Sequence, residues 1–296
     1  PYGLRAEALA PVYGLAECTV GLAVSPPGRG PRIDRVQREA LAAGSALPAP
    51  ADDAHALSMV ACGLALPGHE LRIVDAAGHE LPPRRVGRLE FRGPSATRGY
   101  YRNAEASAAL IHDGWLDSGD LAYLAEGDIV ITGRIKDTII RGGRNLYPYE
   151  LEEAVGGIPG VRRGCVAVFG VAAAGQGTEK LVVVAESRET GAAARQELVR
   201  RINALTVDLL GTPPDDVVLA PPHAVLKTSS GKIRRAATRE VYCGRGFAGD
   251  GRALWLQVAR LGAAGFWQSL RVALRRGGEL LYGGYAWCVY GLLTLP

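Results

Sequence analysis

The chain is poor in sulphur, with five cysteines and one methionine among its 296 residues. The cysteines are scattered, and no two of them stand in a Cys-x-x-Cys pair. This spacing fits neither a zinc site nor a disulfide framework, so we expect reduced thiols and a cytoplasmic setting. Cys18 directly follows a glutamate, but no histidine is placed to orient it as a nucleophile, and we expect a small buried thiol there.

Long runs of one charge are also missing, and 34 basic residues nearly balance 30 acidic ones, for a net charge of +4. This balance gives no indication of nucleic-acid binding. Apolar residues make up 48% of the chain, which is enough for a core, and the length allows one large domain or two smaller ones. The opening residues show no signal-peptide pattern and are typical of the interior of a domain.

Residues 1–133 are predicted to be rich in β-structure. Short strand patterns, separated by turn residues, cover 71–75, 88–93 and 128–134. The segment Pro26–Asp53 is rich in proline, alanine and glycine. We expect it to be a surface insertion that carries one helix over Asp34–Ala43.

From Arg134 onward the pattern changes to alternating strands and helices. A helical pattern begins near Tyr149, and buried-strand runs cover 165–171, 180–187 and 216–220. The segment Ala192–Leu210 carries apolar residues at helical spacing, namely Leu198, Ile202, Leu205 and Leu209. Residues 134–240 are therefore predicted to form a small α+β domain, and the whole chain to be a mixed α/β (α+β) protein.

The last part of the chain, 241–296, is predicted to be a linker followed by a helical hydrophobic tail. Ala253–Arg276 has an apolar side and several arginines, and the 17 residues of Leu280–Pro296 carry no charge. That length is at the lower limit of a bilayer span, and basic amphipathic helices can lie in a membrane interface. Two interpretations stay open: residues 253–296 hold the protein at the inner face of the membrane, peripherally or as an anchor, or the helix packs on a partner domain.

Three motifs occur in order, namely WLDSGDL (Trp115–Leu121), GRIKDTIIRGGRNLYPYELEE (Gly133–Glu153) and LKTSSGKIRR (Leu226–Arg235). With YGLAE (Tyr13–Glu17) and GRLEFRGPSATRGYY (Gly87–Tyr101), they resemble the adenylate-forming (acyl-CoA synthetase/AMP-binding) superfamily. That superfamily activates a carboxylic acid with ATP, giving an acyl-adenylate and pyrophosphate. More narrowly, the chain resembles the fatty acyl-AMP ligases. Ala16 stands where most relatives have threonine, a long segment follows YGLAE, and the hinge and lysine motifs agree.

The resemblance covers residues 1 to about 240 and implies a domain organisation. Residues 1–133 would be the C-terminal part of the large AMP-binding domain, and 134–240 the complete small, mobile domain. The family's Ser/Thr/Gly-rich phosphate-binding loop, whose donors cradle the nucleotide phosphates, would lie upstream of YGLAE and is not in this sequence. We therefore expect the chain to be the C-terminal part of an enzyme and to have little or no activity alone.

The resemblance places the catalytic lysine at Lys232. Displacement at the α-phosphate builds negative charge, which a flexible cation on a loop can stabilise. The alternative is a solvated basic turn. The resemblance places the hinge of the small domain at Lys136, with Gly142 and Gly143 beyond it to ease backbone change. The alternative for these three residues is a structural turn.

The resemblance also implies a nucleotide site. Asp120 would accept both ribose hydroxyls, and Arg134 would contact the ribose. Tyr13 would offer an aromatic face to adenine, with Gly14 permitting close approach. Glu17 would hold Mg²⁺ against the phosphates, because Mg²⁺ prefers hard oxygen ligands. The alternatives are a turn or helix cap for Asp120, a surface ion pair for Arg134, a core tyrosine and a strand-end glutamate.

The implied partners are a fatty acid, ATP with Mg²⁺, and an acceptor that is an acyl carrier protein, CoA or a lipid. Some relatives continue into a glycerophosphate acyltransferase, and the tail of this chain resembles that junction. Two other functions stay open. One is a long-chain acyl-CoA synthetase of the same fold, and the other is a non-catalytic, membrane-associated remnant.

Overall fold

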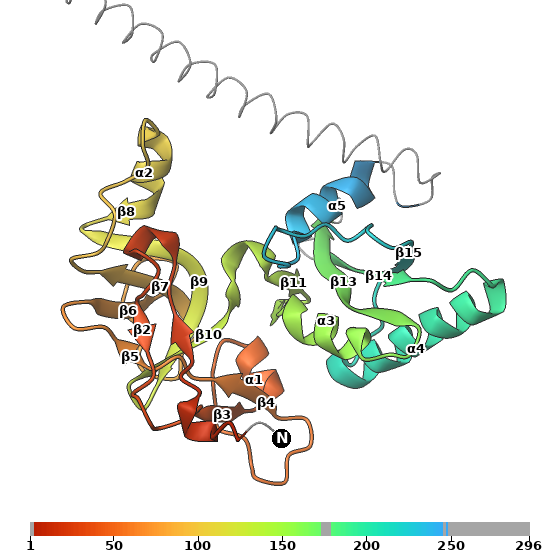
Figure 1. The fold of residues 1–296 in the computed structure, drawn as a ribbon, viewed down its shortest axis with the longest axis horizontal. Coiled ribbons are helices and arrows are strands. Elements are labelled where there is room, and N and C mark those ends of the chain that lie inside the picture. The colour runs from red at the N-terminus through yellow and green to blue at the C-terminus, as the bar shows by residue number, and fades with distance from the viewer. Residues whose placement is uncertain (1–2, 173–178, 245–246, 248–296) are drawn as a thin grey trace, which may run out of the picture. The chain divides into compact units, whose positions relative to one another are not determined.

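The structure is a computed structural model that describes residues 3–172, 179–244 and 247 (Figure 1). Residues 1–240 form one compact unit. The helix predicted over Ala253–Arg276 and the uncharged segment after it lie outside the described residues. The nucleotide-site, hinge and lysine candidates all fall within that compact unit.

An antiparallel sheet frames the first part of that unit. Its strand order is β10-β9-β7-β6, with the short strand β8 paired to β9. Both faces of this sheet carry buried side chains: Tyr123 belongs to one apolar cluster, Phe91 to a second, and Leu89 and Ile129 to a third, and all four are fully buried. The bounds are β6 Glu70–Val74, β7 Gly87–Arg92, β8 Ile111–His112, β9 Trp115–Ala125 and β10 Asp128–Arg134, with helix α2 Ala104–Leu110 before β8.

The segment that follows YGLAE folds differently from our prediction. The helix expected over Asp34–Ala43 is wrong at its start, because Ile33–Val36 is strand β3, paired with β4 (Leu57–Val60), and α1 covers only Arg38–Ala42. Val36 and Leu41 are buried in a cluster with Tyr123, and this tertiary packing decides the local structure. A second small sheet has the order β1-β2-β5, formed by Val12–Tyr13, Ala23–Val24 and Leu64–Ala65.

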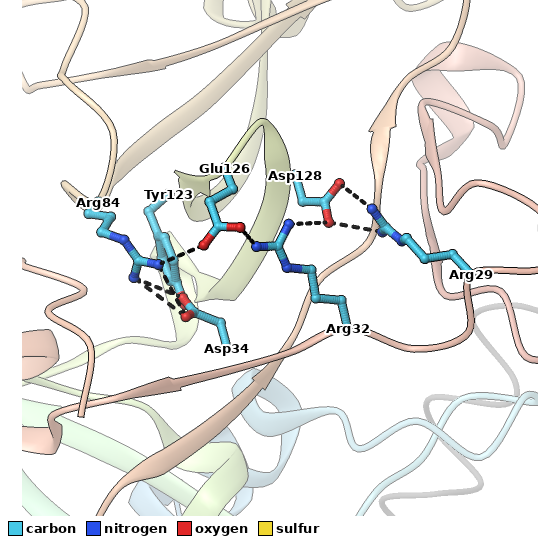
Figure 2. Close-up of polar contacts among 7 residues, drawn as sticks. All are labelled: Arg29, Arg32, Asp34, Arg84, Tyr123, Glu126 and Asp128. Atoms are coloured by element: carbon cyan, nitrogen blue, oxygen red, sulfur yellow. Dashed lines mark hydrogen bonds and ion pairs between the residues drawn. The ribbon is translucent and has the colours of Figure 1, made fainter. Parts of the chain in front are cut away.

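A network of ion pairs fastens this inserted segment to the turn between β9 and β10 (Figure 2). Asp128 contacts Arg29 through Oδ1 to Nη1 at 3.1 Å and Oδ2 to Nη2 at 2.9 Å. Asp34 accepts a hydrogen bond from Tyr123 at 2.8 Å. The network comprises Arg29, Arg32, Asp34, Arg84, Tyr123, Glu126 and Asp128. The segment Pro26–Asp53 is therefore held to the sheet by specific contacts.

The α+β part contains a three-stranded sheet in which β13 and β14 are antiparallel and β14 and β15 are parallel. Helices α3 and α4 cover it, and Leu151, Val183 and Ile202 belong to one buried cluster. A hairpin of β11 and β12 precedes them, and its two turn residues, Gly142 and Gly143, both have positive φ. The bounds are β11 Ile139–Arg141, β12 Arg144–Leu146, α3 Pro148–Gly156, β13 Val161–Ala172, β14 Glu179–Ser187, α4 Ala192–Leu210, β15 Asp216–Ala220 and α5 Arg235–Gly244.

The predicted mixed α+β class is confirmed. The glycine pair at 142–143 closes a hairpin, which supports the structural-turn interpretation of these two residues. The division of the chain at residues 133 and 240 stays a prediction.

Candidate nucleotide site

Two irregularities in neighbouring strands direct Asp120 and Arg134. Opposite Leu89 of β7 the register of β9 shifts, and Gly119 takes a φ of +73°. On the other side, β10 carries an extra residue at Thr132. Such bulges re-aim the side chains beside them and are common next to active sites. Asp120 lies within the 11-residue strand β9 and not in a turn or helix cap.

Asp120, Tyr13 and Arg134 meet at one carboxylate. The Tyr13 hydroxyl donates to Asp120 Oδ2 at 2.5 Å, and Arg134 Nε lies 3.3 Å from Oδ1. The Asp120 side chain is 9% exposed, whereas that of Arg134 is 71% exposed. Each carboxylate oxygen can accept more than one hydrogen bond, so both keep capacity for another donor. Three residues from separate sequence motifs thus form one polar group with an exposed guanidinium beside it.

Burial sets the protonation of this group. It raises the pKa of the Asp120 carboxyl, against the hydrogen bond from Tyr13 and the charge of Arg134. Burial also raises the pKa of Tyr13 far above its ordinary value, and the nearby carboxylate raises it further. The Tyr13 phenol therefore stays protonated and remains a hydrogen-bond donor.

Gly14 is required by the loop that contains it. A Cβ at this position would lie 1.5 Å from the carbonyl oxygen of Val20. The chain turns back sharply here, because Leu22 N donates to Tyr13 O and Val20 N to Leu15 O, both at 3.0 Å. Any side chain at position 14 would clash with this turn whatever ligand is bound. The predicted contact between Gly14 and adenine stays a prediction.

Glu17 lies in a short 3-10 turn, Ala16–Cys18, beside the segment around Tyr100. Its Oε1 accepts the Tyr100 hydroxyl at 2.6 Å, and its carbonyl oxygen accepts Thr97 N at 2.8 Å. No described residue contacts Oε2 in a hydrogen bond or ion pair. Tyr100 was not among our candidates, although it stands in the GRLEFRGPSATRGYY motif. It fixes the position of the predicted metal ligand.

Lys232 lies on a tight loop whose ends, Lys227 and Ile233, pair as a β-bridge. Thr228 closes the loop, since its N donates to Lys232 O at 2.8 Å and its Oγ1 accepts from Lys232 N at 3.1 Å. Gly231 takes the left-handed conformation that the turn needs, with a φ of +82°. The side chain of Lys232 is exposed and forms no ion pair with the residues that the structure describes. The backbone is thus fixed while the amine stays available to a ligand.

Lys136 is exposed in a 3-10 turn, Ile135–Asp137, directly after β10. Thr138 closes this turn with two hydrogen bonds to the carbonyl oxygen of Arg134, from N at 3.0 Å and from Oγ1 at 2.9 Å. Over residues 3–172 and 179–244, no hydrogen bond or ion pair joins Lys136, Lys232 or Glu17 to the Tyr13–Asp120–Arg134 group. Among the described residues, hydrogen bonds and ion pairs therefore join three of the predicted site residues, namely Tyr13, Asp120 and Arg134.

No helix in the described part of the chain has both the length and the apolar character needed to cross a bilayer. The tail for which membrane association was predicted, residues 253–296, lies outside that part, and its association with a membrane stays a prediction.

Comparison with known proteins identifies relatives along most of the chain. The family of AMP-binding enzymes matches residues 3–101. A protein of Caulobacter vibrioides, provisionally named an acyl-CoA synthetase, is 38% identical over 249 residues, which are 82% of this chain and 42% of the relative. The long-chain-fatty-acid–AMP ligase FadD26 of Mycobacterium marinum is 35% identical over 266 residues, which are 83% of this chain and 44% of that ligase.

Solved structures of similar proteins share the fold. A structure from work on fatty acyl-adenylate ligases of E. coli and L. pneumophila superposes with a TM-score of 0.74 at 32% identity, over 81% of this chain and 42% of that chain. The chain spans about two fifths of the length of the curated relatives it matches. The family match, the relatives along most of the chain and the shared fold agree: residues 3–101 match the AMP-binding enzymes, and the chain as a whole is similar to fatty acyl-AMP ligases.

Proposed function

We propose that the protein containing this chain activates a fatty acid with ATP, forming a fatty acyl-adenylate and releasing pyrophosphate. The observation that carries the proposal is the meeting of Tyr13 and Arg134 on the buried carboxylate of Asp120. A related fatty-acid–AMP ligase and the superposed fatty acyl-adenylate ligase support the class of substrate.

Within this proposal, the Asp120 carboxylate accepts the ribose hydroxyls with the lone pairs that Tyr13 and Arg134 leave free. The exposed guanidinium of Arg134 lies where it can bond the same sugar. The Tyr13 hydroxyl orients the carboxylate, and its ring offers a face to the base. Lys232 supplies the mobile positive charge for the α-phosphate and carboxylate oxygens, and it arrives when the small domain turns about Lys136.

Glu17 would hold Mg²⁺, which would offset the phosphate charge. The described residues contain no group of three or more His, Cys, Asp or Glu that could hold a metal ion. This fits Mg²⁺, which usually binds through one or two carboxylates and completes its shell with substrate phosphates and water. Tyr100 occupies one oxygen of Glu17 and leaves the other for the ion.

Fatty-acid-dependent exchange of pyrophosphate into ATP tests the activation step. In the complete protein, Lys232→Ala should lower the exchange about 10²–10³-fold, by analogy with the loss of one preorganised group that stabilises transition-state charge. Lys227→Ala, at the exposed base of the same loop, is the matched control and should leave most of the activity. Equal effects of the two substitutions, or none, would refute the role of Lys232. The 296-residue chain alone should show little or no exchange.

The acceptor of the acyl group needs a separate assay. We propose transfer to a carrier protein or lipid rather than to CoA, because a fastened segment occupies the region after YGLAE. Incubation of the complete protein with ATP, a fatty acid and CoA should give acyl-adenylate without acyl-CoA. Accumulation of acyl-CoA would identify the protein as an acyl-CoA synthetase instead.

A further inference from the structure

Arg235, the second arginine of the KIRR run, links three separate segments. Its Nε and Nη2 donate to the two carboxylate oxygens of Glu152 on α3, at 2.7 and 2.6 Å. Its Nη1 donates to Asp137 Oδ2 at 2.6 Å. Glu152 also accepts the backbone N of Val168 in β13 at 3.0 Å. One guanidinium therefore ties the beginning of α5 to helix α3 and to the turn after β10.

These contacts are strong by their chemistry and their surroundings. The pairing with Glu152 is bidentate, a geometry that the planar guanidinium favours, and all three side chains are mostly buried. Burial alone would lower the pKa of Arg235, but Glu152 and Asp137 outweigh this and raise it. Separating Arg235 from Glu152 or Asp137 would leave a buried charge without its partner and with little water to screen it. We therefore expect the three side chains to move together.

The chain is fastened on the other side of the turn as well. Arg134 pairs with Asp120 through its side chain, and its backbone is in register with Asp120 in the β9–β10 ladder. Between Arg134 and Asp137 lie only Ile135 and Lys136, and both are exposed. Any rotation of the residues after 137 against the sheet must therefore be absorbed at these two residues, together with loss of the Thr138 hydrogen bonds to Arg134.

We propose that Arg235 is a positioning residue that binds the turn at Asp137 to the Lys232 loop, so that both turn as one rigid body about Ile135 and Lys136. Lys232 is only three residues before Arg235, and Arg234 N donates to Leu226 O at 2.8 Å at the base of the loop. The Arg235 side chain thus links Asp137 directly to the residues next to the loop. The mechanical coupling needs no assumption about the reaction. Its effect on catalysis rests on the proposed function.

Amide hydrogen exchange of the 296-residue chain, followed by NMR, measures the coupling directly. The reporters are hydrogen-bonded amides at the two ends of the link, namely those of Thr138, Thr228, Gly231 and Arg234. Asp137→Asn should accelerate exchange about 10-fold at all four, because loss of the carboxylate charge weakens the hydrogen bond from Arg235 and lowers the free energy of opening. Asp208→Asn, the same change at an exposed position of α4, is the control and should affect none of them.

Acceleration at Thr138 alone would overturn the proposal, because the two segments would then open independently. No acceleration at any reporter would overturn it equally. If Asp137→Asn also accelerates exchange of the core amide of Val183, the fold as a whole has loosened. The test is then repeated with Arg235→Lys in place of Asp137→Asn. Lysine keeps the charge but cannot bind both carboxylates in the same geometry, so the same four reporters should respond.

Kinetics of the complete protein separate positioning from simple stability. Asp137→Asn should lower kcat for pyrophosphate exchange about 10-fold and leave KM for ATP within about twofold, since the amine is misplaced while nucleotide contacts remain. A rise in KM with unchanged kcat would contradict the positioning role. If Lys232→Ala has no effect on exchange, the proposed function fails while the amide-exchange result for the coupling stands.

Discussion

The carboxylate of Asp128 is the buried centre of the ion-pair network in Figure 2, and removing its charge should destabilise the fold. Its side chain is 1% exposed, whereas its partners Arg29 and Arg32 are 31% and 33% exposed. Breaking a buried pair by removing one partner typically costs about 3–5 kcal/mol. Because both arginines can recover part of their hydration, we expect Asp128→Asn to cost about 2–4 kcal/mol.

Glu126, two residues earlier in the same turn, provides a matched control. It also pairs with Arg32 and lies near Arg84, but its side chain is 66% exposed. An exposed ion pair contributes about 0–1 kcal/mol, so Glu126→Gln should cost no more than that. Both substitutions change a carboxylate into an amide at positions two residues apart. The comparison therefore isolates the effect of burial on the free-energy cost.

Urea unfolding of the 296-residue chain, followed by far-ultraviolet circular dichroism, gives both free energies. Added salt should reduce the small effect of Glu126→Gln and leave that of Asp128→Asn nearly unchanged, because buried charges are screened less. Equal costs for the two substitutions would refute the reasoning. So would a cost for Asp128→Asn that disappears in salt.

Three further substitutions or labels test other parts of the site. Burial raises the pKa of the Asp120 carboxyl above its ordinary 3.8. Between pH 3.8 and the raised pKa the folded state binds more protons than the unfolded state, so the free energy of unfolding falls as the pH rises through this range. Asp120→Asn should therefore raise the melting temperature more at neutral than at acidic pH while weakening nucleotide binding, and a gain independent of pH would contradict this. Gly14→Ala should cost about 1–3 kcal/mol or more, measured as the urea midpoint, because its Cβ meets Val20 O. Burial raises the pKa of the Cys18 thiol whereas Cys243 is exposed, so maleimide should label Cys243 first in a mass-spectrometric time course, and equal rates would count against the packing.

Local periodicity was enough to predict several elements to the residue. Helix Ala192–Leu210 and strands Asp128–Arg134 and Asp216–Ala220 have the bounds predicted from the sequence. Each of them buries an apolar stripe or face whose spacing is visible without knowledge of its partner. The type and extent of these elements are therefore encoded within the segments themselves.

Where partners lie far apart in the sequence, the same reasoning fails. The helix predicted over Asp34–Ala43 was wrong at its start, where the chain is strand β3; Tyr123, whose hydroxyl donates a hydrogen bond to Asp34 there, is 89 positions away in the sequence. The bulge at Gly119 depends on pairing with β7, which no local pattern encodes. The site residues were found through motif resemblance, but the hydrogen bond from Tyr13 to Asp120 follows only from the fold.

The role of Arg235 was missed for the same reason. Helix α5 begins at Arg235, and the acidic partners of Arg235 are 83 and 98 positions away in the sequence. An arginine that follows a predicted catalytic lysine, in a chain with acidic helices upstream, is the signal that could have suggested an internal partner.

The clash at Gly14 limits which substitutions the loop after Tyr13 can accept. A library that varies this position to alter base preference would mostly yield misfolded protein, because the obstacle is the neighbouring main chain. Ala16, the first residue of the 3-10 turn Ala16–Cys18, is exposed, and variation there would leave the backbone intact. A library aimed at this loop should therefore vary Ala16 and keep the glycine.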